Sequence, residues 1–428
     1  MTILILALAF IALVLIGIPI SFAMGISSLA ALVYHAQLPF NLIVHRTMMG
    51  VDSFVLLAIP LFIFAGTIME QGGISEKLVR FAHTLLGRFR GGLPMVVVGS
   101  TMLQSGISGS TVADVSAMAA MTLKPLEDEG YSRPYSLSVI GASCAFAILI
   151  PPCILMVIVA AVANTSVVAV FAAGIVPSVV LGAMMLTFIH VQARMKNMPA
   201  GKKSSFAEML KGLKDALLAL GVPILIFGGI RAGVATVTEM AAVAVIYSML
   251  VGGLVYRRLS WRRIYNALVE TCVSTGVITM LMGFAMIFGY LLATEGVPGA
   301  VAAWMQSSHV PPWGVLVITA IIFVFVGAVL EGAPAVLIFV PILLPVVRSL
   351  GIDIVHWLTV VVLASGIGLF VPPTGLAVLV ACSVGKVRMD QMIKPLMPFL
   401  LLLIAGLAVV IFVPWFSTVL PQAMGLTY

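Results

Sequence analysis

Long apolar segments recur along the whole chain and alternate with short polar ones. A helix needs about 20 apolar residues to cross the roughly 30 Å of hydrocarbon in a bilayer. We therefore predict ten membrane-spanning helices, near residues 2–17, 19–35, 53–71, 134–163, 166–191, 217–231, 238–255, 271–292, 355–383 and 396–416. No basic region precedes the first of them, which favours a retained span over a cleaved signal peptide.

Two further apolar segments, 92–126 and 312–346, are too long for one crossing. Each is interrupted near its middle, the first by a Ser/Gly-rich stretch at 104–111 and the second by Glu-Gly-Ala-Pro at 331–334. We predict two re-entrant hairpins, each of which enters the membrane, turns at a polar tip and leaves on the side from which it came.

Composition agrees with a lipid environment. Of the 428 residues, 62% are hydrophobic and only 9% are charged, whereas a soluble domain has about 25% charged residues. The net charge of +7 does not indicate a nucleic-acid partner, because the basic residues lie in short loops between apolar segments. All four cysteines fall inside apolar segments, so we expect no disulfide framework.

The basic residues also predict the orientation. With both termini on the periplasmic side of a bacterial inner membrane, every Lys and Arg except Arg46, Arg231 and Arg348 falls in a cytoplasmic segment. This topology makes the first hairpin enter from the cytoplasm and the second from the periplasm. Three basic amphipathic segments, 73–90, 204–216 and 257–270, are predicted to form helices at the cytoplasmic membrane surface.

Helix-breaking residues repeat at a constant spacing. Five pairs are 221 positions apart: Gly106 and Gly327, Gly130 and Gly351, Pro151 and Pro372, Pro152 and Pro373, and Pro177 and Pro398. The predicted fold class is therefore an all-α polytopic membrane protein with an inverted-topology repeat, in which each half has five spans and one re-entrant hairpin. This architecture is typical of secondary transporters.

Each half breaks its helices twice at membrane depth, at the hairpin tip and at a Pro-Pro doublet. Proline lacks an N–H and frees carbonyl groups that lipid cannot satisfy. Those carbonyls and nearby hydroxyls suit Na⁺, and the N-termini of the interrupted helices suit a carboxylate. The alternative is that the breaks are kinks for close helix packing. Asp114 and Glu331 are the two carboxylates within the hairpins, and Asp114 could instead brace its helix.

Several motifs together are similar to the large membrane subunit of the tripartite ATP-independent periplasmic (TRAP) transporters. They are Ser105-Gly-Ile-Ser-Gly-Ser-Thr-Val-Ala-Asp114, Glu129-Gly-Tyr131, Leu149-Ile-Pro-Pro152, Thr236-Val-Thr-Glu-Met-Ala-Ala-Val-Ala-Val-Ile-Tyr247, Gly351-Ile-Asp353 and Gly366-Ile-Gly-Leu-Phe-Val-Pro-Pro-Thr-Gly375. The resemblance implies Na⁺-coupled import of carboxylate substrates that a periplasmic binding protein delivers. It also implies a small four-helix membrane partner and an elevator-type movement of a hairpin-bearing domain.

The resemblance implies a division of the chain and two sodium sites. Residues 1–71 would form scaffold spans, 72–191 the first hairpin and transport spans, 192–270 cytoplasmic arm helices and scaffold spans, and 271–428 the second hairpin and transport spans. The predicted sodium-binding residues are Ser105, Gly106, Ser108, Ser110, Ile150, Pro151, Gly327, Glu331, Gly332, Gly368, Val371 and Thr374. The predicted substrate-binding residues are Ser108, Thr111, Pro152, Pro334, Pro373 and Gly375.

Two positions depart from the family pattern. Cys153 follows the first Pro-Pro where a hydroxyl is common, and Val371 precedes the second where Thr is common. At both positions we expect backbone carbonyls, rather than side chains, to contact the ion.

Two other classes of function are alternatives. One is a stand-alone Na⁺- or H⁺-coupled carboxylate carrier that needs no binding protein. The other is an intramembrane enzyme, but the sequence has no His-Glu-x-x-His, Gly-x-Ser-x-Gly or phosphate-binding Walker motif. We therefore predict a transporter, not an enzyme.

Overall fold

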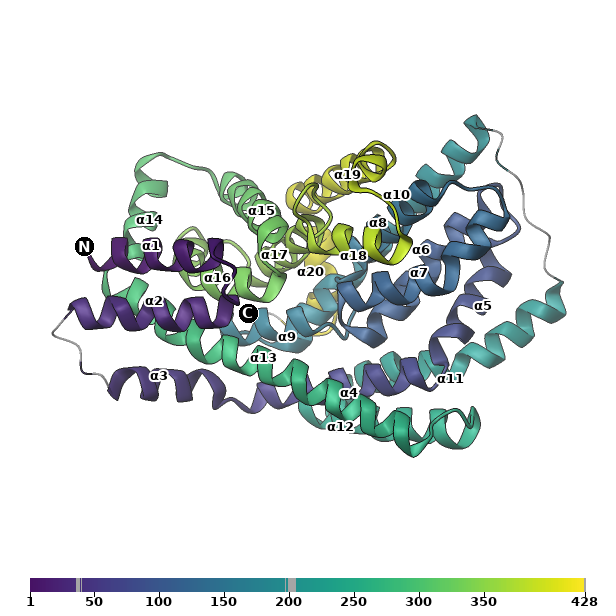
Figure 1. Ribbon diagram of the computed structural model, residues 1–428, viewed down its shortest axis with the longest axis horizontal. Coiled ribbons are helices and arrows are strands. Elements are labelled where there is room, and N and C mark those ends of the chain that lie inside the picture. Colours follow the sequence, from purple (N-terminus) through teal and green to yellow (C-terminus); the bar gives the residue numbers. More distant parts are fainter. Residues whose placement is uncertain (36–38, 40, 197, 199–204, 427–428) are drawn as a thin grey trace.

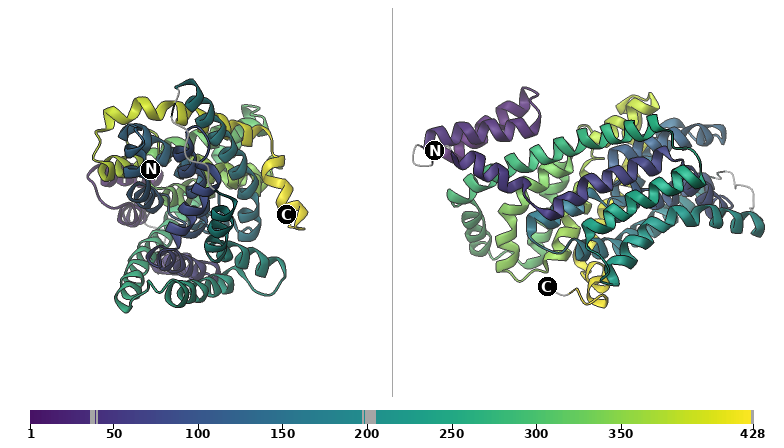
Figure 2. Two further views of the ribbon diagram at one scale, coloured as in Figure 1. Left: turned by 90° about the vertical axis from the view of Figure 1, so that its right-hand side faces the viewer. Right: turned by 90° about the horizontal axis from the view of Figure 1, so that it is seen from below.

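The computed structural model describes residues 1–35, 39, 41–196, 198 and 205–426, which fold almost entirely into helices (Figure 1). The chain begins with α1 (Thr2–Leu15), α2 (Ile20–His35), α3 (Asn41–Val51) and the short 3₁₀ helix η1 (Phe54–Leu57), which leads into α4 (Ala58–Gln71). Helices α1 and α2 pack against each other as an antiparallel pair at the edge of the molecule (Figure 2).

Helix α13 (Trp261–Thr294) and the shorter helix α12 (Val237–Leu250) lie along one side of the molecule. Helix α13 runs for 34 residues and packs on α2, α3 and α4. Helix α12 packs on α4 and α11 (Phe206–Arg231), and it continues as the π-helical turn η2 (Val251–Val255). Thr236 and Glu239 form a capping box at the start of α12: the Glu239 carboxylate accepts from the Thr236 N–H at 2.7 Å.

The remaining helices form two related series. The first comprises α5 (Ile74–Leu86), α6 (Gly92–Ser108), α7 (Thr111–Asp128), α8 (Arg133–Ala147), α9 (Ile154–Ala163) and α10 (Val167–Met195). The second comprises α14 (Val297–Ser307), α15 (Pro312–Val329), α16 (Gly332–Ser349), α17 (Ile354–Gly368), α18 (Leu376–Gly385) and α19 (Met389–Phe412), followed by α20 (Trp415–Ala423).

The predicted repeat is confirmed at the level of individual helices. The bounds of α16 are those of α7 displaced by 221 positions, and the same holds for α17 and α8. Helices α6 and α7 form the first hairpin, and α15 and α16 form the second. Both hairpins lead into a glycine with positive φ, Gly130 at 87° and Gly351 at 65°, where a side chain would be strained. Both Pro-Pro doublets interrupt a helix, as predicted, and each contains a cis peptide bond.

Eight helices in the described part of the chain are long and apolar enough to cross a membrane. Six of them coincide with predicted spans, and the other two are the limbs of the second hairpin. The predicted spans 134–163 and 355–383 are each two helices joined at a Pro-Pro break. Helix α1 has 14 residues, about 21 Å at 1.5 Å per residue, so α1 is shorter than a full crossing.

Two of the three predicted surface helices are wrong as separate elements. Residues 206–216 form the first part of α11 and residues 261–270 form the first part of α13, without interruption. The physical reason is that each continuous helix begins at a good cap, Ser205 and Ser260, and neither has a proline before the apolar part starts. The third segment is a separate helix, α5.

Candidate functional site

A cavity of about 470 Å³ lies where the two hairpin tips meet α4 and α13. The first tip contributes residues 109–113, the second contributes 331–334, and the start of α9 contributes Ile154 and Leu155. Helices α4 and α13 contribute the opposite wall, and the turn between α1 and α2 closes one edge. The polar side chains of these last three elements are Thr67, Glu70, Glu270, Ser274 and Ser21.

At the first tip, the structure brings the hairpin against the first Pro-Pro break. A Cβ placed on Gly106 would lie 2.9 Å from the Pro151 carbonyl oxygen, so only glycine allows this approach. The Cys153 Sγ lies 4.0 Å from the Gly109 carbonyl oxygen. Gly106 and Pro151, which were predicted as parts of one sodium site, are therefore neighbours.

At the second tip, the hairpin packs against the end of α17, just before the second Pro-Pro break. A Cβ on Gly368 would lie 2.9 Å from the Gly327 carbonyl carbon, and one on Gly327 would lie 3.0 Å from the Ser365 carbonyl oxygen. Ser365 is fully buried and was missed in the sequence, where it reads as an ordinary position in an apolar helix. Contact with Gly327 of the second hairpin is what distinguishes Ser365.

The loop after the second Pro-Pro is closed by its own hydrogen bonds. The Gly375 N–H donates to the Val371 carbonyl at 3.0 Å, and the Ala377 N–H donates to the Leu369 carbonyl at 3.2 Å. Pro373 and Thr374 are exposed and do not line the cavity. Pro373 and Gly375, which were predicted to contact substrate, lie apart from the cavity wall in this structure, because the loop folds back on the end of α17.

Five of the predicted site residues line the cavity directly: Ser110, Thr111, Glu331, Gly332 and Pro334. The others that the structure describes lie behind this surface or beside it: Ser105, Gly106, Ile150, Pro151, Pro152, Gly327, Gly368, Val371, Pro373, Thr374 and Gly375. The side chain of Ser108 lies outside the described part of the chain. The predicted set therefore divides into a cavity surface and the two breaks packed behind it.

The N-termini of three helices line the part of the cavity that the tips form. Ser110 is the N-cap of α7 and its Oγ accepts from the Ala113 N–H at 3.5 Å. Helices α7, α9 and α16 all begin at the cavity, and a helix N-terminus carries a partial positive charge and N–H groups without helical partners. Asp114 lies in the first turn of α7, is fully buried and does not line the cavity, which favours the bracing role.

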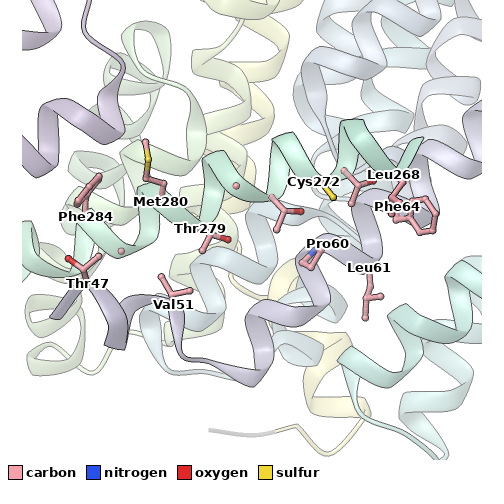
Figure 3. A pocket seen from close by; sticks show the side chains of 14 residues that line it. Thr47, Val51, Pro60, Leu61, Phe64, Leu268, Cys272, Thr279, Met280 and Phe284 are labelled. Carbon is pink, nitrogen blue, oxygen red and sulfur yellow. The ribbon is translucent and has the colours of Figure 1, made fainter. Parts of the chain in front are cut away.

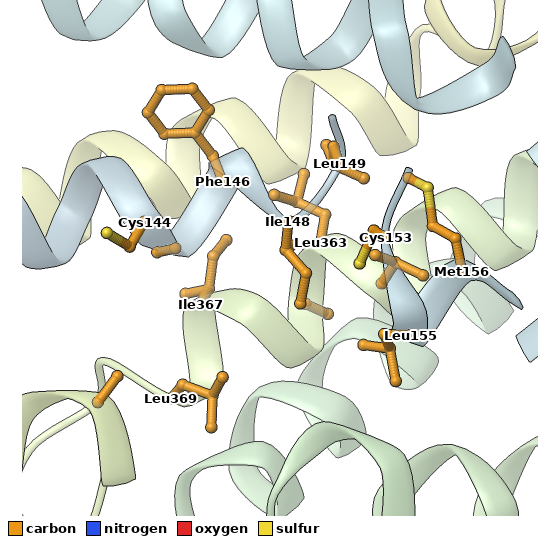
Figure 4. Packing of buried hydrophobic residues seen from close by; sticks show 14 of the residues in the cluster. Cys144, Phe146, Ile148, Leu149, Cys153, Leu155, Met156, Leu363, Ile367 and Leu369 are labelled. Carbon is orange, nitrogen blue, oxygen red and sulfur yellow. The ribbon is translucent and has the colours of Figure 1, made fainter. Parts of the chain in front are cut away.

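The breaks are held by a dense core. Around them, Phe146 and Leu149 pack with Leu363 and Ile367 of α17 (Figure 4), and all four side chains are fully buried. Such interiors are packed as tightly as crystals and resist local shifts. The two breaks therefore belong to one rigid unit.

A second hollow does not suit an anion. It has a volume of about 640 Å³ and lies between α3, α4 and α13 (Figure 3). Its described lining is apolar apart from threonine hydroxyls and Cys272, and it includes neither hairpin tip. The cavity between the tips is the better candidate site for a carboxylate.

Sequence reasoning missed the wall opposite the tips. Glu70 and Glu270 are carboxylates in otherwise apolar stretches, which is itself a signal of function. Glu270 was assigned to a surface helix, and nothing in the sequence places α4 and α13 across from the tips. The turn at Pro19–Ser21 gave no chemical signal at all.

Comparison with known proteins gives a consistent result. Residues 7–416 match the family model "Tripartite ATP-independent periplasmic transporter, DctM component". YgiK of Salmonella typhimurium is 35% identical over 95% of this chain and 94% of its own length. The C4-dicarboxylate TRAP transporter large permease protein DctM of Pseudomonas aeruginosa is 34% identical over 88% of each chain. The crystal structure of the Alcanivorax borkumensis YdaH transporter has a TM-score of 0.65 with 17% identity, covering 91% of this chain and 90% of that one, which shows the same fold.

Proposed function

This chain belongs to the DctM family of tripartite ATP-independent periplasmic transporters, and from this premise we propose that it imports an organic acid across the bacterial inner membrane together with Na⁺. It is a transporter permease subunit, not an enzyme. The observation that carries the proposal is the cavity between two hairpin tips that come from the two inverted halves. A site at the junction of inverted halves can be exposed to either side of a membrane by movement of one part against another.

We assign the two sodium ions to the two contacts between a tip and a break. One lies where Gly106 meets Pro151, and the other lies where Gly327 meets Gly368. At each contact a glycine lets backbone approach a backbone carbonyl closely, which supports a site built from carbonyl oxygens. Hard oxygen ligands of this kind suit an alkali cation, and the helix starts beside them suit the substrate carboxylate.

The elevator-type movement follows from the same division. Packing of α7 on α18, of α9 on α16 and of α8 on α17 joins the hairpins and breaks of both halves into one unit, which we assign as the transport domain, with α1–α4 and α11–α12 as the main scaffold. We propose that the first unit slides against the second with both termini on the periplasmic side. The distribution of Lys and Arg along the chain supports this orientation.

The partners follow from the family. The word tripartite in the family description implies two further components. We propose a small four-helix membrane subunit and a periplasmic binding protein that delivers the carboxylate. A stand-alone carrier, the rival hypothesis, would need neither.

Reconstitution separates the two hypotheses. The chain, purified with any membrane subunit that accompanies it, is placed in liposomes under an inward Na⁺ gradient, and uptake of radiolabelled organic acids is measured with and without periplasmic extract. We expect uptake only when extract is present. Equal uptake without extract would establish a stand-alone carrier.

A further inference from the structure

The cavity between the tips has an uneven distribution of charge. Three carboxylates line it, Glu70 on α4, Glu270 on α13 and Glu331 at the second tip. None of the described lining residues is Lys, Arg or His. A cavity for an anion with no cationic side chain must bind it through other groups, and the arrangement of those groups restricts which anions fit.

The three carboxylates differ in which positive charges lie close to them. Glu331 belongs to the second tip, beside the contact between Gly327 and Gly368 to which the second sodium ion is assigned. Glu70 and Glu270 lie on the opposite wall, away from both proposed ions. Both are exposed, and within the described residues neither forms an ion pair. Glu70 also borders a neighbouring hollow together with Arg258 and Arg263, so the negative charge that acts on this half of the cavity comes mainly from Glu270.

The opposite wall offers mostly hydrogen-bond acceptors. Besides the two carboxylates it has the hydroxyls of Thr67 and Ser274, which can both donate and accept. The tip side offers the N–H groups at the starts of α7 and α9, which donate. A substrate carboxylate thus belongs at the tips, and the rest of the substrate faces groups that require donors.

We propose that this cavity selects organic acids with one carboxylate and a tail of hydroxyl or ammonium donors, and that Glu70 and Glu270 exclude dicarboxylates. The proposal rests on the proposed function, because it takes the cavity as the substrate site. A second carboxylate about 7 Å from one glutamate, in surroundings between water and protein surface, loses roughly tenfold in affinity. A tail that donates hydrogen bonds to the two glutamates instead gains affinity.

Matched ligand pairs test the proposal. Purified protein in Na⁺ is heated with gluconate or glucarate, which share the hydroxyls at C2–C5 and differ at C6, where gluconate has a hydroxymethyl group and glucarate a second carboxylate. It is also heated with 4-aminobutyrate or glutamate, which differ by one carboxylate. The rise in melting temperature with ligand concentration gives the ligand concentration for a half-maximal shift. We expect at least one monocarboxylate to act at a tenfold or more lower concentration than its dicarboxylate partner. The two pairs distinguish hydroxyl from ammonium tails.

The variant Glu70→Gln/Glu270→Gln should lose most of this gap, the difference in half-maximal concentration between the two ligands of a pair. Its melting temperature without ligand should be unchanged, because both side chains are exposed and glutamine has nearly the same shape. Glu129→Gln, an exposed carboxylate outside the cavity lining, is the control and should keep the gap. An unchanged gap in the double variant, equal binding within each pair, or no binding by any of the four ligands would overturn the proposal. Uptake that depends on Na⁺ and periplasmic extract would still support the proposed function in each of those cases.

Discussion

Ala145 and Gly366 occupy equivalent positions in the two repeats, 221 residues apart, and they touch each other. A Cβ on Gly366 would lie 2.3 Å from the Ala145 carbonyl oxygen, where α8 crosses α17. Equivalent residues of two inverted halves can meet only near the axis that relates the halves. The axis therefore passes between the two Pro-Pro breaks, and the proposed ion sites lie on either side of it.

The crossing predicts that Gly366→Ala is harmful. The added Cβ would have to push α8 away from α17, and such overpacking costs about 1–3 kcal/mol. We expect a lower melting temperature and a large loss of uptake. Gly289→Ala in α13 is the control, because its Cβ would meet nothing within 4 Å and alanine favours a helix. Equal melting of the two variants would argue against the tight crossing.

The tip contacts predict a change in sodium affinity. Gly106→Ala and Gly327→Ala each place a methyl group about 3 Å from a carbonyl oxygen, that of Pro151 or of Ser365. The carbonyls must move, so the Na⁺ concentration for half-maximal uptake should rise several-fold in both variants. Gly228→Ala, with open space around its Cβ, should leave that concentration unchanged. The sodium sites are misassigned if both tip variants keep the native sodium dependence.

Ser110 is predicted to matter more than Cys153. Ser110→Ala removes the N-cap of α7, which costs about 1 kcal/mol. If the Ser110 oxygen also contacts Na⁺, a further roughly tenfold to hundredfold loss of sodium affinity follows. Ser110→Asn keeps a cap and separates the two effects, since stability should recover and sodium affinity should not. Cys153→Ser should transport normally with native sodium affinity, because backbone rather than the thiol is expected at the ion.

The architecture was largely predictable, because breakers and apolar length are local properties of the sequence. The spacing of Pro151 and Pro372 revealed the repeat, and the Ser/Gly-rich stretch 104–111 predicted the first tip, which contains Gly109 with φ of 65°. The cavity wall was not predictable in the same way. Glu70 and Glu270 face the tips only because α4 and α13 pack there. Thr374 lies outside the cavity because hydrogen bonds close its own loop.

Orientation has its own test. Single cysteines at Lys211 and Gln422, both exposed, are introduced after Cys272 is replaced by serine, and whole cells are treated with a membrane-impermeant thiol reagent. The cysteine at position 422 should react and the one at 211 should be shielded until the membrane is permeabilised. Labelling in the reverse order would place the termini in the cytoplasm.

Sodium-driven uptake tests the central claim most directly. Proteoliposomes that contain the permease and receive periplasmic extract are given an inward Na⁺ gradient at constant pH, without ATP, and accumulation of labelled organic acid is followed. The account predicts accumulation above the external concentration, and its collapse when choline replaces Na⁺. Undiminished accumulation in choline would contradict it, since another ion would then drive transport and the contacts between tips and breaks would not be sodium sites.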